Sequence, residues 1–450
     1  MRAFPRLPLA ALIAQAFFLP PGPAGALPPG FSVELVHTGL NFPTALRFAP
    51  DGRLFYTELS TGQIRVFENA FAPTSTLWAT VPVAGGGERG LLGLALHPDM
   101  PDSPYVYVFH TNPNPWVNRV VRLEDQGGAG TNYTVLFDNL PAASSIHHGG
   151  RIGFGGDGLL YVTFGDQNVP SAAQSEADVR GKIHRITRGG QPAPGNPFGA
   201  TNPAYLKGVR NPFGLCFDPV TGTGYFTENG PSCDDEVNGI VLGSNYGWGP
   251  NDFCGGQPVG TQAAIVSFTP TIAPTGCCVY RGSAYPPHLD GNLFFTEYND
   301  WTLRRVKFKD GLPMTADTVE VFATATDPMI DVTMGSEGYL WFCTDVSIGR
   351  IVYPSTAGVS PGALGPALSL VPNPFRDRVL LHASGAEGVV RVEVADIQGR
   401  RVRRWTSSLP LVIAWDGRDE AGVTVPAGVY VVWASGRWFD VTERLVRIGR

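Results

Sequence analysis

A strand motif that recurs six times is the feature of this sequence that most constrains its fold. Each copy has a turn, often Asp-Gly, followed by an aromatic or β-branched run that ends in Thr or another polar residue. The spacing is comparable to the about 40 to 50 residues of a four-stranded antiparallel blade. The sequence therefore predicts an all-β, six-bladed β-propeller; a pair of β-sandwiches is the alternative, but it gives no reason for a sixfold period. The six copies are residues 49–58, 97–110, 155–166, 218–229, 288–298 and 336–345.

Composition agrees with an all-β fold. The 56 Gly and 40 Pro residues among 450 disfavour long helices, because neither is tolerated well in a helix interior. Hydrophobic residues make up 43% of the chain, enough for a large core. The formal charge of −6 argues against a nucleic-acid-binding surface.

The first 26 residues are typical of a secretory signal peptide. Arg2 and Arg6 precede an apolar run, and Ala24-Gly25-Ala26 offers the small residues that signal peptidase requires. A membrane anchor is the alternative, but Gln15 and the prolines after Leu19 leave the run too short for a span of about 20 residues. We expect cleavage after Ala26 and a periplasmic, cell-surface or extracellular protein, with no transmembrane span.

Export permits disulfides, and the chain has six cysteines. Cys216 and Cys343 lie in strand-like runs, where buried thiols are common. The other four lie in loops rich in Gly and Pro, and we expect bridges among them: Cys233, Cys254, Cys277 and Cys278.

The chain changes character after Tyr353. Residues 354–370 read as an uncharged linker rich in Ser, Gly, Ala and Pro, so the propeller is assigned to residues 27–353. Residues 371–450 contain short strands at the spacing of a small β-sandwich. Their patterns resemble the immunoglobulin-like module of flagellar hook-capping proteins and of type IX secretion sorting domains. The resemblance implies attachment to a cell surface or to secretion machinery.

Two clusters of polar residues in the propeller could carry acid–base chemistry. His147 stands in a His-His-Gly-Gly-Arg turn before the third repeat, which itself ends at Asp166. A carboxylate at the end of that strand can orient the imidazole as a general base. Arg210-Asn211 places a cation and an amide at a turn before the fourth repeat. A structural, hydrogen-bonded histidine is the plain alternative for His147.

An acidic loop follows the fourth repeat. Gly230 and Pro231 expose backbone carbonyls beside Asp234, Asp235 and Glu236. Because Ca²⁺ takes oxygen ligands, this composition indicates a calcium site; a solvated acidic turn is the alternative.

Residues 31–353 resemble the soluble glucose/sorbosone dehydrogenases, six-bladed propellers that use pyrroloquinoline quinone (PQQ). The resemblance implies that His147 takes the proton of the sugar C1 hydroxyl while hydride passes to the quinone, that Asp166 orients it, and that Arg210 and Asn211 contact the cofactor. It further implies Ca²⁺ held by the carbonyls of Gly230 and Pro231, and a second Ca²⁺ at Glu236 and Tyr246. The motifs that carry the resemblance are FPTALRFAPDGRLFYTE, GERGLLGLALHPD, HHGGRIGFGGDGLLYVTFGD, GKIHRI, GVRNPFGLCFDP, ENGPSCDDEVN and NYGWGP.

The sequence departs from this family where cations hold the three carboxylates of the quinone. Asn299 stands in place of a Lys, Pro328 and Ile330 in place of two Arg, and Phe213 in place of a Gln. Arg304 and Arg305 are the nearest candidates to compensate.

The leading hypothesis is a quinone-dependent sugar or polyol dehydrogenase of altered cofactor or substrate preference, and we expect its affinity for the quinone to be poor. A calcium-stabilised binding module that has lost the quinone site and a calcium-dependent, lactonase-type hydrolase are the alternatives.

Overall fold

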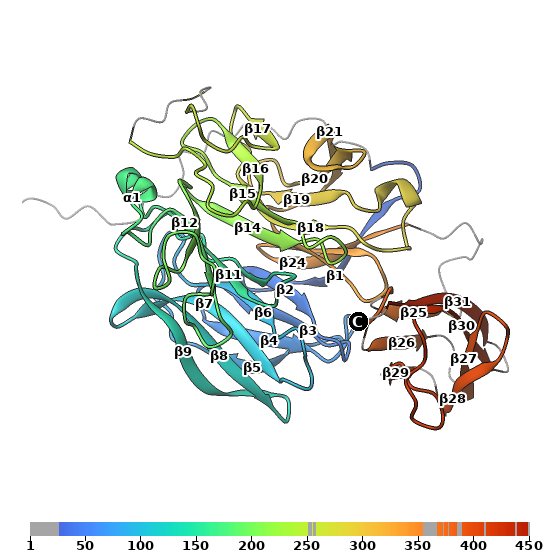
Figure 1. The fold of residues 1–450 in the computed structure, drawn as a ribbon. Coiled ribbons are helices and arrows are strands. Elements are labelled where there is room, and N and C mark those ends of the chain that lie inside the picture. Colours follow the sequence, from blue (N-terminus) through green and yellow to red (C-terminus); the bar gives the residue numbers. More distant parts are fainter. Residues whose placement is uncertain are drawn as a thin grey trace, which may run out of the picture.

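The computed structural model describes residues 27–250, 254, 258–353, 367–371, 373–376, 378–384, 389–408, 411–436 and 439–448 (Figure 1). The predicted signal peptide and residues 354–366 of the predicted linker lie outside them. No helix among the described residues is long and apolar enough to cross a membrane.

Six four-stranded antiparallel sheets form a β-propeller, as the sixfold repeat predicts. The innermost strand of each sheet contacts the innermost strands of the two neighbouring sheets, which closes the ring (Figure 1). In blades 1 to 3 the strands are β2 (Pro43–Phe48), β3 (Leu54–Glu58), β4 (Gln63–Phe67) and β5 (Thr76–Thr80); β6 (Leu91–Leu96), β7 (Tyr105–Pro113), β8 (Trp116–Gln126) and β9 (Ala129–Pro141); and β10 (Ile152–Phe154), β11 (Leu160–Phe164), β12 (Lys182–Ile186) and β13 (Ala204–Lys207).

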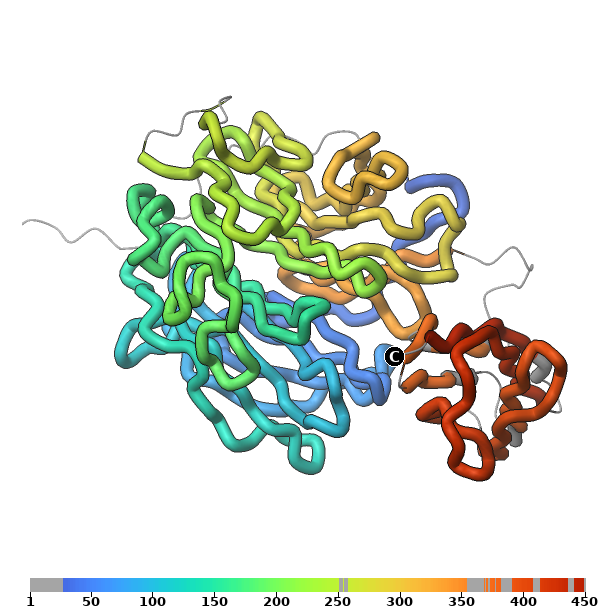
Figure 2. The backbone as a smooth tube through the Cα atoms, in the orientation of Figure 1, coloured from blue at the N-terminus to red at the C-terminus, as the bar shows by residue number. Residues whose placement is uncertain are grey.

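The ring is completed by a strand from the start of the described chain. β1 (Ser32–Thr38) pairs antiparallel with β24 (Ser347–Val352) and becomes the outer strand of blade 6, so early and late segments lie side by side (Figure 2). Two short helices, α1 (Pro170–Gln174) and η1 (Pro287–Leu289), lie in connections. The remaining strands form blades 4 to 6. Blade 4 has β14 (Pro212–Phe217), β15 (Gly224–Glu228), β16 (Asp235–Gly239) and β17 (Val266–Phe268); blade 5 has β18 (Pro274–Val279), β19 (Leu293–Glu297), β20 (Thr302–Lys309) and β21 (Leu312–Thr324); and blade 6 has β22 (Met329–Met334), β23 (Leu340–Thr344) and β24, with β1 at its edge.

The repeated motif is the second strand of each blade, and its threonine has a structural purpose. The innermost strand of blade 4 has an irregular register between Pro212 and Leu215, which frees backbone groups from the ladder. Thr227 of the neighbouring strand accepts a hydrogen bond from the Gly214 amide and donates one to the Thr275 carbonyl of blade 5. The buried hydroxyl therefore satisfies the irregularity and links two blades.

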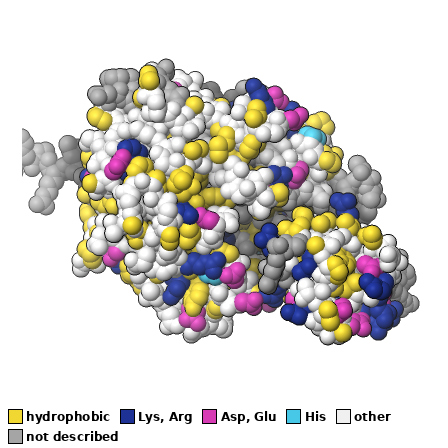
Figure 3. Space-filling model, in the orientation of Figure 1, with side chains coloured by type: hydrophobic (Ala, Val, Ile, Leu, Met, Phe, Trp, Pro, Cys, Tyr) yellow, Lys and Arg dark blue, Asp and Glu magenta, His cyan; other side chains and the backbone are white. Residues whose placement is uncertain are grey.

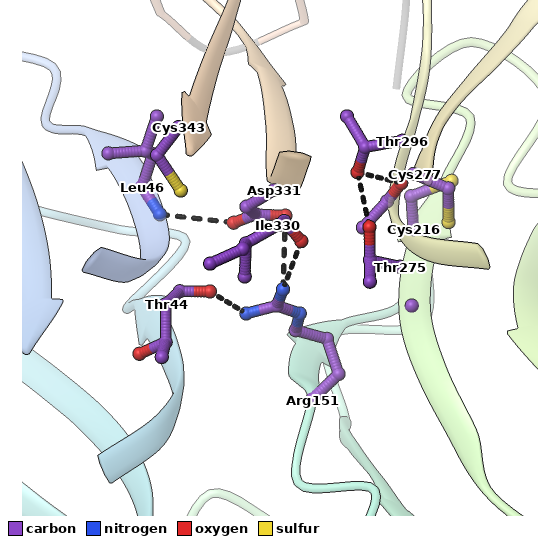
Figure 4. Close-up of polar contacts among 12 residues, drawn as sticks. Thr44, Leu46, Arg151, Cys216, Thr275, Cys277, Thr296, Ile330, Asp331 and Cys343 are labelled. Carbon is purple, nitrogen blue, oxygen red and sulfur yellow. Dashed lines mark hydrogen bonds and ion pairs between the residues drawn. The ribbon is translucent and has the colours of Figure 1, made fainter. Parts of the chain in front are cut away.

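A buried arginine ties the innermost strands together inside the ring. The Arg151 guanidinium donates hydrogen bonds to the carbonyls of Thr44 in blade 1 and Ile330 in blade 6 (Figure 4). It also donates one to the Leu92 carbonyl in blade 2. Its side chain is 1% exposed, and Asp331 lies 3.5 Å away as its counter-ion. This charge is therefore paired and hydrogen-bonded, as burial requires.

Two further sheets follow the propeller. A three-stranded sheet and a four-stranded sheet pack on one apolar cluster that includes Phe375, Val394, Trp415 and Leu445. This arrangement agrees with a small β-sandwich, but its first strand, β25, starts at Ala367, inside the residues predicted as linker, because the apolar Ala-Leu-Ser-Leu run pairs with β26. The strands are β25 (Ala367–Val371), β26 (Val379–Ser384), β27 (Val389–Asp396), β28 (Arg401–Ser408), β29 (Leu411–Trp415), β30 (Gly428–Gly436) and β31 (Phe439–Arg447).

The cysteines follow the prediction only in part. Cys233 and Cys254 form a disulfide, and Cys343 is a buried free thiol. Cys277 and Cys278 are also free, and they lie in β18 rather than in a loop, so the expectation of bridges for them is wrong. The sequence Pro-Thr-Gly before them suggested a turn, but this Gly-containing stretch is the irregular start of an innermost strand.

On the face drawn in Figure 3, basic side chains of the propeller lie among acidic ones.

Candidate functional site

The predicted site residues converge where loops enter the innermost strands. His147 lies in the connection from β9 to β10, and Arg210 and Asn211 lie between β13 and β14. Asp166 follows β11, and its amide donates a hydrogen bond to the Arg210 carbonyl. The Asn211 side-chain oxygen accepts a hydrogen bond from the Gly149 amide. The His-His-Gly-Gly-Arg turn and the Arg-Asn-Pro turn are therefore built against each other.

His147 and Asp166 form a buried hydrogen-bonded pair. His147 Nδ1 lies 2.6 Å from Asp166 Oδ1, and the two side chains are 6% and 0% exposed. His147 has a φ of +63°, and the Gln167 side chain holds its carbonyl at 2.9 Å. Among the described residues, no group hydrogen-bonds Nε2 of His147. A carboxylate that accepts the Nδ1 proton leaves the lone pair on Nε2, as a general base requires.

Trp248 completes this pair, although its role was not predicted. Its indole N–H donates to Asp166 Oδ2 at 2.8 Å, and the Asn168 amide donates to Oδ1. Both carboxylate oxygens are therefore engaged, which fixes the plane of Asp166. Trp248 lies in the Asn-Tyr-Gly-Trp-Gly-Pro motif, which carries part of the family resemblance. The sequence does not show that this motif lies close to Asp166, so the role of Trp248 could not be inferred from it.

His148 is enclosed by polar neighbours instead. Its Nδ1 lies 3.1 Å from Asn118 Oδ1, and its Nε2 lies 3.0 Å from the Ser144 carbonyl. Burial lowers the pKa of His148 to about 4, so its ring is neutral at pH 7. This environment is typical of a structural histidine.

Glu88 is a second residue that the sequence reasoning missed. Its carboxylate accepts a hydrogen bond from the His148 amide and contacts the Asn211 side-chain nitrogen at 3.3 Å. Burial raises the pKa of Glu88. Glu88 lies in the Gly-Glu-Arg-Gly sequence before β6, which carried part of the family resemblance but no assigned role.

Arg210 extends from the same turn into a neighbouring pocket of about 430 Å³. Its guanidinium donates to the carbonyls of Asn229 and Gly230, both at 2.8 Å, and lies over the Trp248 ring. Burial lowers the pKa of Arg210. Arginine stays protonated in proteins, so the group is a cation. The pocket lining also includes Glu228, Pro231, Glu236 and Tyr246.

The oxygen-rich lining fits a hard cation such as Ca²⁺, since it combines carboxylates with backbone carbonyls. Gly230, Pro231, Glu236 and Tyr246 all lie along this one pocket, whereas the resemblance assigned the first two and the last two to separate Ca²⁺ ions. The Gly230 carbonyl already accepts a hydrogen bond from Arg210. A cation at that carbonyl must therefore share it with Arg210 or displace the guanidinium.

Asp235 does not line the pocket, so the structure does not support its predicted role as a metal ligand. Its Oδ1 accepts the Gly230 amide, and its Oδ2 accepts the amides of Ile272 and Ala273. These three backbone hydrogen bonds make Asp235 an anchor of the acidic loop rather than an available ligand. The nearby cluster of Cys233, Asp234 and Cys254 is no thiolate metal site either, because the two sulfurs form a disulfide.

Arg210 is the one Lys or Arg among the described residues that line the pocket. Asn299 is exposed, and its side-chain amide contacts the Thr271 carbonyl. Ile330 is 2% exposed and packs with Leu46 and Trp341 between blades 1 and 6. An arginine at 330 would enter that core, so the alignment that matched Ile330 to a cofactor-binding residue does not describe this structure.

The two candidate compensating cations are already paired. Arg304 forms an ion pair with the buried Glu297, and Arg305 lies 3.2 Å from Glu320. Phe213, which replaces a Gln of the family, lies with its ring beside the Arg151 guanidinium. The oxygen-rich lining of the pocket therefore suits Ca²⁺. The site provides few cations to pair with the three carboxylates of the quinone.

Comparisons with known proteins agree with the geometry. The model of the glucose / sorbosone dehydrogenase family matches residues 40–353. The aldose sugar dehydrogenase YliI of Escherichia coli is 28% identical over 365 residues, which cover 75% of this chain and 98% of that protein. The quinoprotein glucose dehydrogenase B of Acinetobacter calcoaceticus is 32% identical over 254 residues, 49% of this chain and 52% of that protein.

Among solved structures, the PQQ-bound aldose sugar dehydrogenase of Streptomyces coelicolor is 29% identical and superposes with a TM-score of 0.64. The superposition covers 73% of this chain and 99% of that chain.

Proposed function

Because the chain belongs to the glucose/sorbosone dehydrogenase family, we propose that it oxidises an aldose sugar at C1 with PQQ as the hydride acceptor, Ca²⁺ beside the quinone and His147 as the base. The observation that carries the proposal is the buried hydrogen bond of 2.6 Å between His147 and Asp166.

His147 supplies the proton acceptor for the sugar hydroxyl. Asp166 accepts a hydrogen bond from His147 Nδ1–H, and the Trp248 indole and the Asn168 amide fix the orientation of Asp166. The imidazole is therefore already oriented, with its lone pair on Nε2, before the sugar binds. As His147 takes the proton, the imidazolium that forms is stabilised by the Asp166 carboxylate at the other nitrogen. A positioned base of this kind contributes about 10²- to 10⁴-fold to a rate.

The neighbouring pocket supplies the electrostatics. A bound PQQ would supply the hydride acceptor for the sugar carbon. Gly230 and Pro231 would hold Ca²⁺ through their carbonyls, and Arg210 would stabilise negative charge that develops beside them. Asn211, fixed between Gly149 and Glu88, would position the cofactor against the His147 turn.

The proposal includes export. The apolar run before Pro20 and the small residues through Ala26 support a cleaved signal peptide, and the Cys233–Cys254 disulfide suits an oxidising compartment. The C-terminal module is proposed to attach the enzyme to the cell surface or to present it to secretion machinery.

Reconstitution with PQQ and Ca²⁺ tests the function. The expected result is a bound quinone chromophore and aldose-dependent reduction of an electron-accepting dye. His147→Gln should remove about 10²-fold or more of that activity, whereas His288→Gln, a matched change at an exposed histidine, should leave it unchanged.

Three results would contradict the proposal. A bound chromophore without sugar oxidation would indicate a binding module. Lactone hydrolysis that depends on His147 without quinone would indicate a hydrolase. Loss of activity in His148→Gln, but not in His147→Gln, would show that His148, and not His147, is the base.

A further inference from the structure

Two free cysteines face each other between neighbouring blades. Cys216 lies near the end of β14, and Cys277 lies in β18, the innermost strands of blades 4 and 5. Their sulfur atoms are 3.3 Å apart (Figure 4). A disulfide needs about 2.05 Å, so closure requires a shift of roughly 1.2 Å, which small side-chain rotations can supply.

The pair opens onto a cavity remote from the His147 turn. A cavity of about 890 Å³ is lined by Cys216, Cys277 and Cys278, together with the carboxyl-terminal parts of the innermost strands. The His147 and Arg210 loops instead precede the innermost strands, at their amino-terminal ends. The cavity therefore gives a small oxidant a route to the sulfurs without passing the proposed sugar site.

The two other free thiols are placed differently. Cys278 points to the opposite face of β18 from Cys277, because side chains alternate along a strand, and it packs among residues of blades 5 and 6. Cys343 is buried, and its thiol donates to the Pro43 carbonyl at 3.5 Å. Among the described free cysteines, only Cys216 and Cys277 have sulfur atoms placed for a bond with each other.

We propose that Cys216 and Cys277 are a dithiol site that low-molecular-weight disulfides oxidise to a cross-link between blades 4 and 5. One thiolate attacks the oxidant RSSR, forms a mixed disulfide and releases one thiol RSH. The second thiolate attacks the protein sulfur of that mixed disulfide and releases the second RSH. The two cysteines lose two protons and two electrons, and RSSR is reduced to two RSH.

The cross-link has a structural consequence. Blades 4 and 5 are separate hydrogen-bonded sheets, so the pair joins them covalently across 61 residues of sequence. Closing such a loop restricts the unfolded chain and stabilises the folded one. Burial and the adjacent Cys277 thiol raise the pKa of Cys216, so thiolate is scarce and closure in the folded protein is slow.

Peptide mapping of the full chain tests the site. The protein is incubated with oxidised glutathione, alkylated under denaturing conditions without reductant, and digested. The expected product is a peptide pair joined through Cys216 and Cys277, with two fewer free thiols than before incubation. Because Cys277 and Cys278 share a peptide, the map is repeated on Cys278→Ser, which should retain the cross-link. The melting temperature of the wild type should rise by on the order of 5 °C on oxidation, and that of Cys216→Ser should not.

Recovery of Cys216 and Cys277 as separately alkylated peptides, or as stable glutathione adducts, would overturn the proposal. A cross-link that persists in Cys277→Ser but disappears in Cys278→Ser would show that Cys278, and not Cys277, is the partner of Cys216. The wild-type map decides the question even if a substituted chain fails to fold, and neither result depends on the proposed sugar oxidation.

Discussion

Replacing Asp166 by Asn is the sharpest test of the proposed base. Asp166 accepts three hydrogen bonds, from His147 Nδ1–H and the Asn168 amide at Oδ1 and from the Trp248 indole at Oδ2. An Asn side chain has one acceptor oxygen and one NH₂ group. With its oxygen toward His147, the NH₂ group meets the Trp248 N–H. With its oxygen toward Trp248, the NH₂ group meets Nδ1 and forces the proton onto Nε2.

Both orientations reduce the rate, by different amounts. The first loses a hydrogen bond to a charged acceptor, worth about 1.5 to 3 kcal/mol, and loosens the pair. The second removes the lone pair from Nε2, and the wrong tautomer in a comparable Ser-His-Asp site costs about 10⁴-fold. We therefore expect kcat to fall by about 10² to 10⁴, with little change in PQQ binding, because Asp166 does not line the Arg210 pocket.

Dye-coupled sugar oxidation at saturating PQQ and Ca²⁺ measures this effect. Trp248→Phe is the matched control, because it removes one hydrogen bond to Asp166 but leaves its charge. Its kcat should fall by about tenfold, the equivalent of a hydrogen bond worth about 1.4 kcal/mol. An Asp166→Asn enzyme whose kcat stays within fivefold of the wild type would refute the role given to the pair.

Three other expectations follow from the site and the core. Calorimetry should show weak PQQ binding by the wild type, and Asn299→Lys should strengthen that binding in low salt. The control Val220→Lys, at the cavity beside Cys216, should not change it. Sub-micromolar affinity in the wild type would contradict the expectation of weak binding. Chelation should lower the melting temperature if Ca²⁺ occupies the Gly230 pocket, by up to the equivalent of about 2.7 kcal/mol at a hundredfold excess over Kd, and identical melting curves would argue against a metal. Burial lowers the pKa of His148 to about 4 and that of His184 to about 3. Because both rings must stay neutral in the folded protein, the free energy of unfolding should fall as the pH drops from 6.5 towards 4, by about 3 kcal/mol for His148 alone. Urea titrations at pH 7 and 4.5 measure that loss, which His148→Gln should reduce; a loss equal to that of the wild type would contradict the assignment.

The propeller was predictable because its strongest signal is local. Each repeat shows a turn and an alternating strand, and the second strand of every blade lies where the motif placed it. The pairing of β1 with β24 is not local, since no repeat of the motif marks Ser32–Thr38. Likewise, the threonine of the motif could be recognised, but its bond across to the Thr275 carbonyl of blade 5 depends on the twist between blades.

The site was predictable as a set of turns but not as a network. The His147–Asp166 pair follows from the resemblance, and the structure places His147 Nδ1 and Asp166 Oδ1 within hydrogen-bond distance. Trp248 and Glu88 were missed because each reaches its partner from another blade. Asp235 was misassigned because composition reports the carboxylate but not the backbone amides that occupy it. Cys277 was misassigned because Gly and Pro mark irregular strand starts as well as loops.

The two ends of β14 raise the question of whether the sulfur pair and the sugar site influence each other. Asn211 immediately precedes β14, and Cys216 lies five residues later near its other end. Between them the register is irregular from Pro212 to Leu215, and Thr227 holds the Gly214 amide there. A displacement at Cys216 is therefore opposed by this anchored segment before it reaches Asn211.

We accordingly expect oxidation of the pair to change stability but not catalysis. Protein treated with oxidised glutathione should melt at a higher temperature than reduced protein, while kcat and KM for the sugar stay within twofold. Cys216→Ser, which cannot form the bond, controls for effects of glutathione elsewhere. A kcat that changes severalfold on oxidation in the wild type, but not in Cys216→Ser, would show that β14 transmits the movement and that the irregular segment does not isolate the two ends.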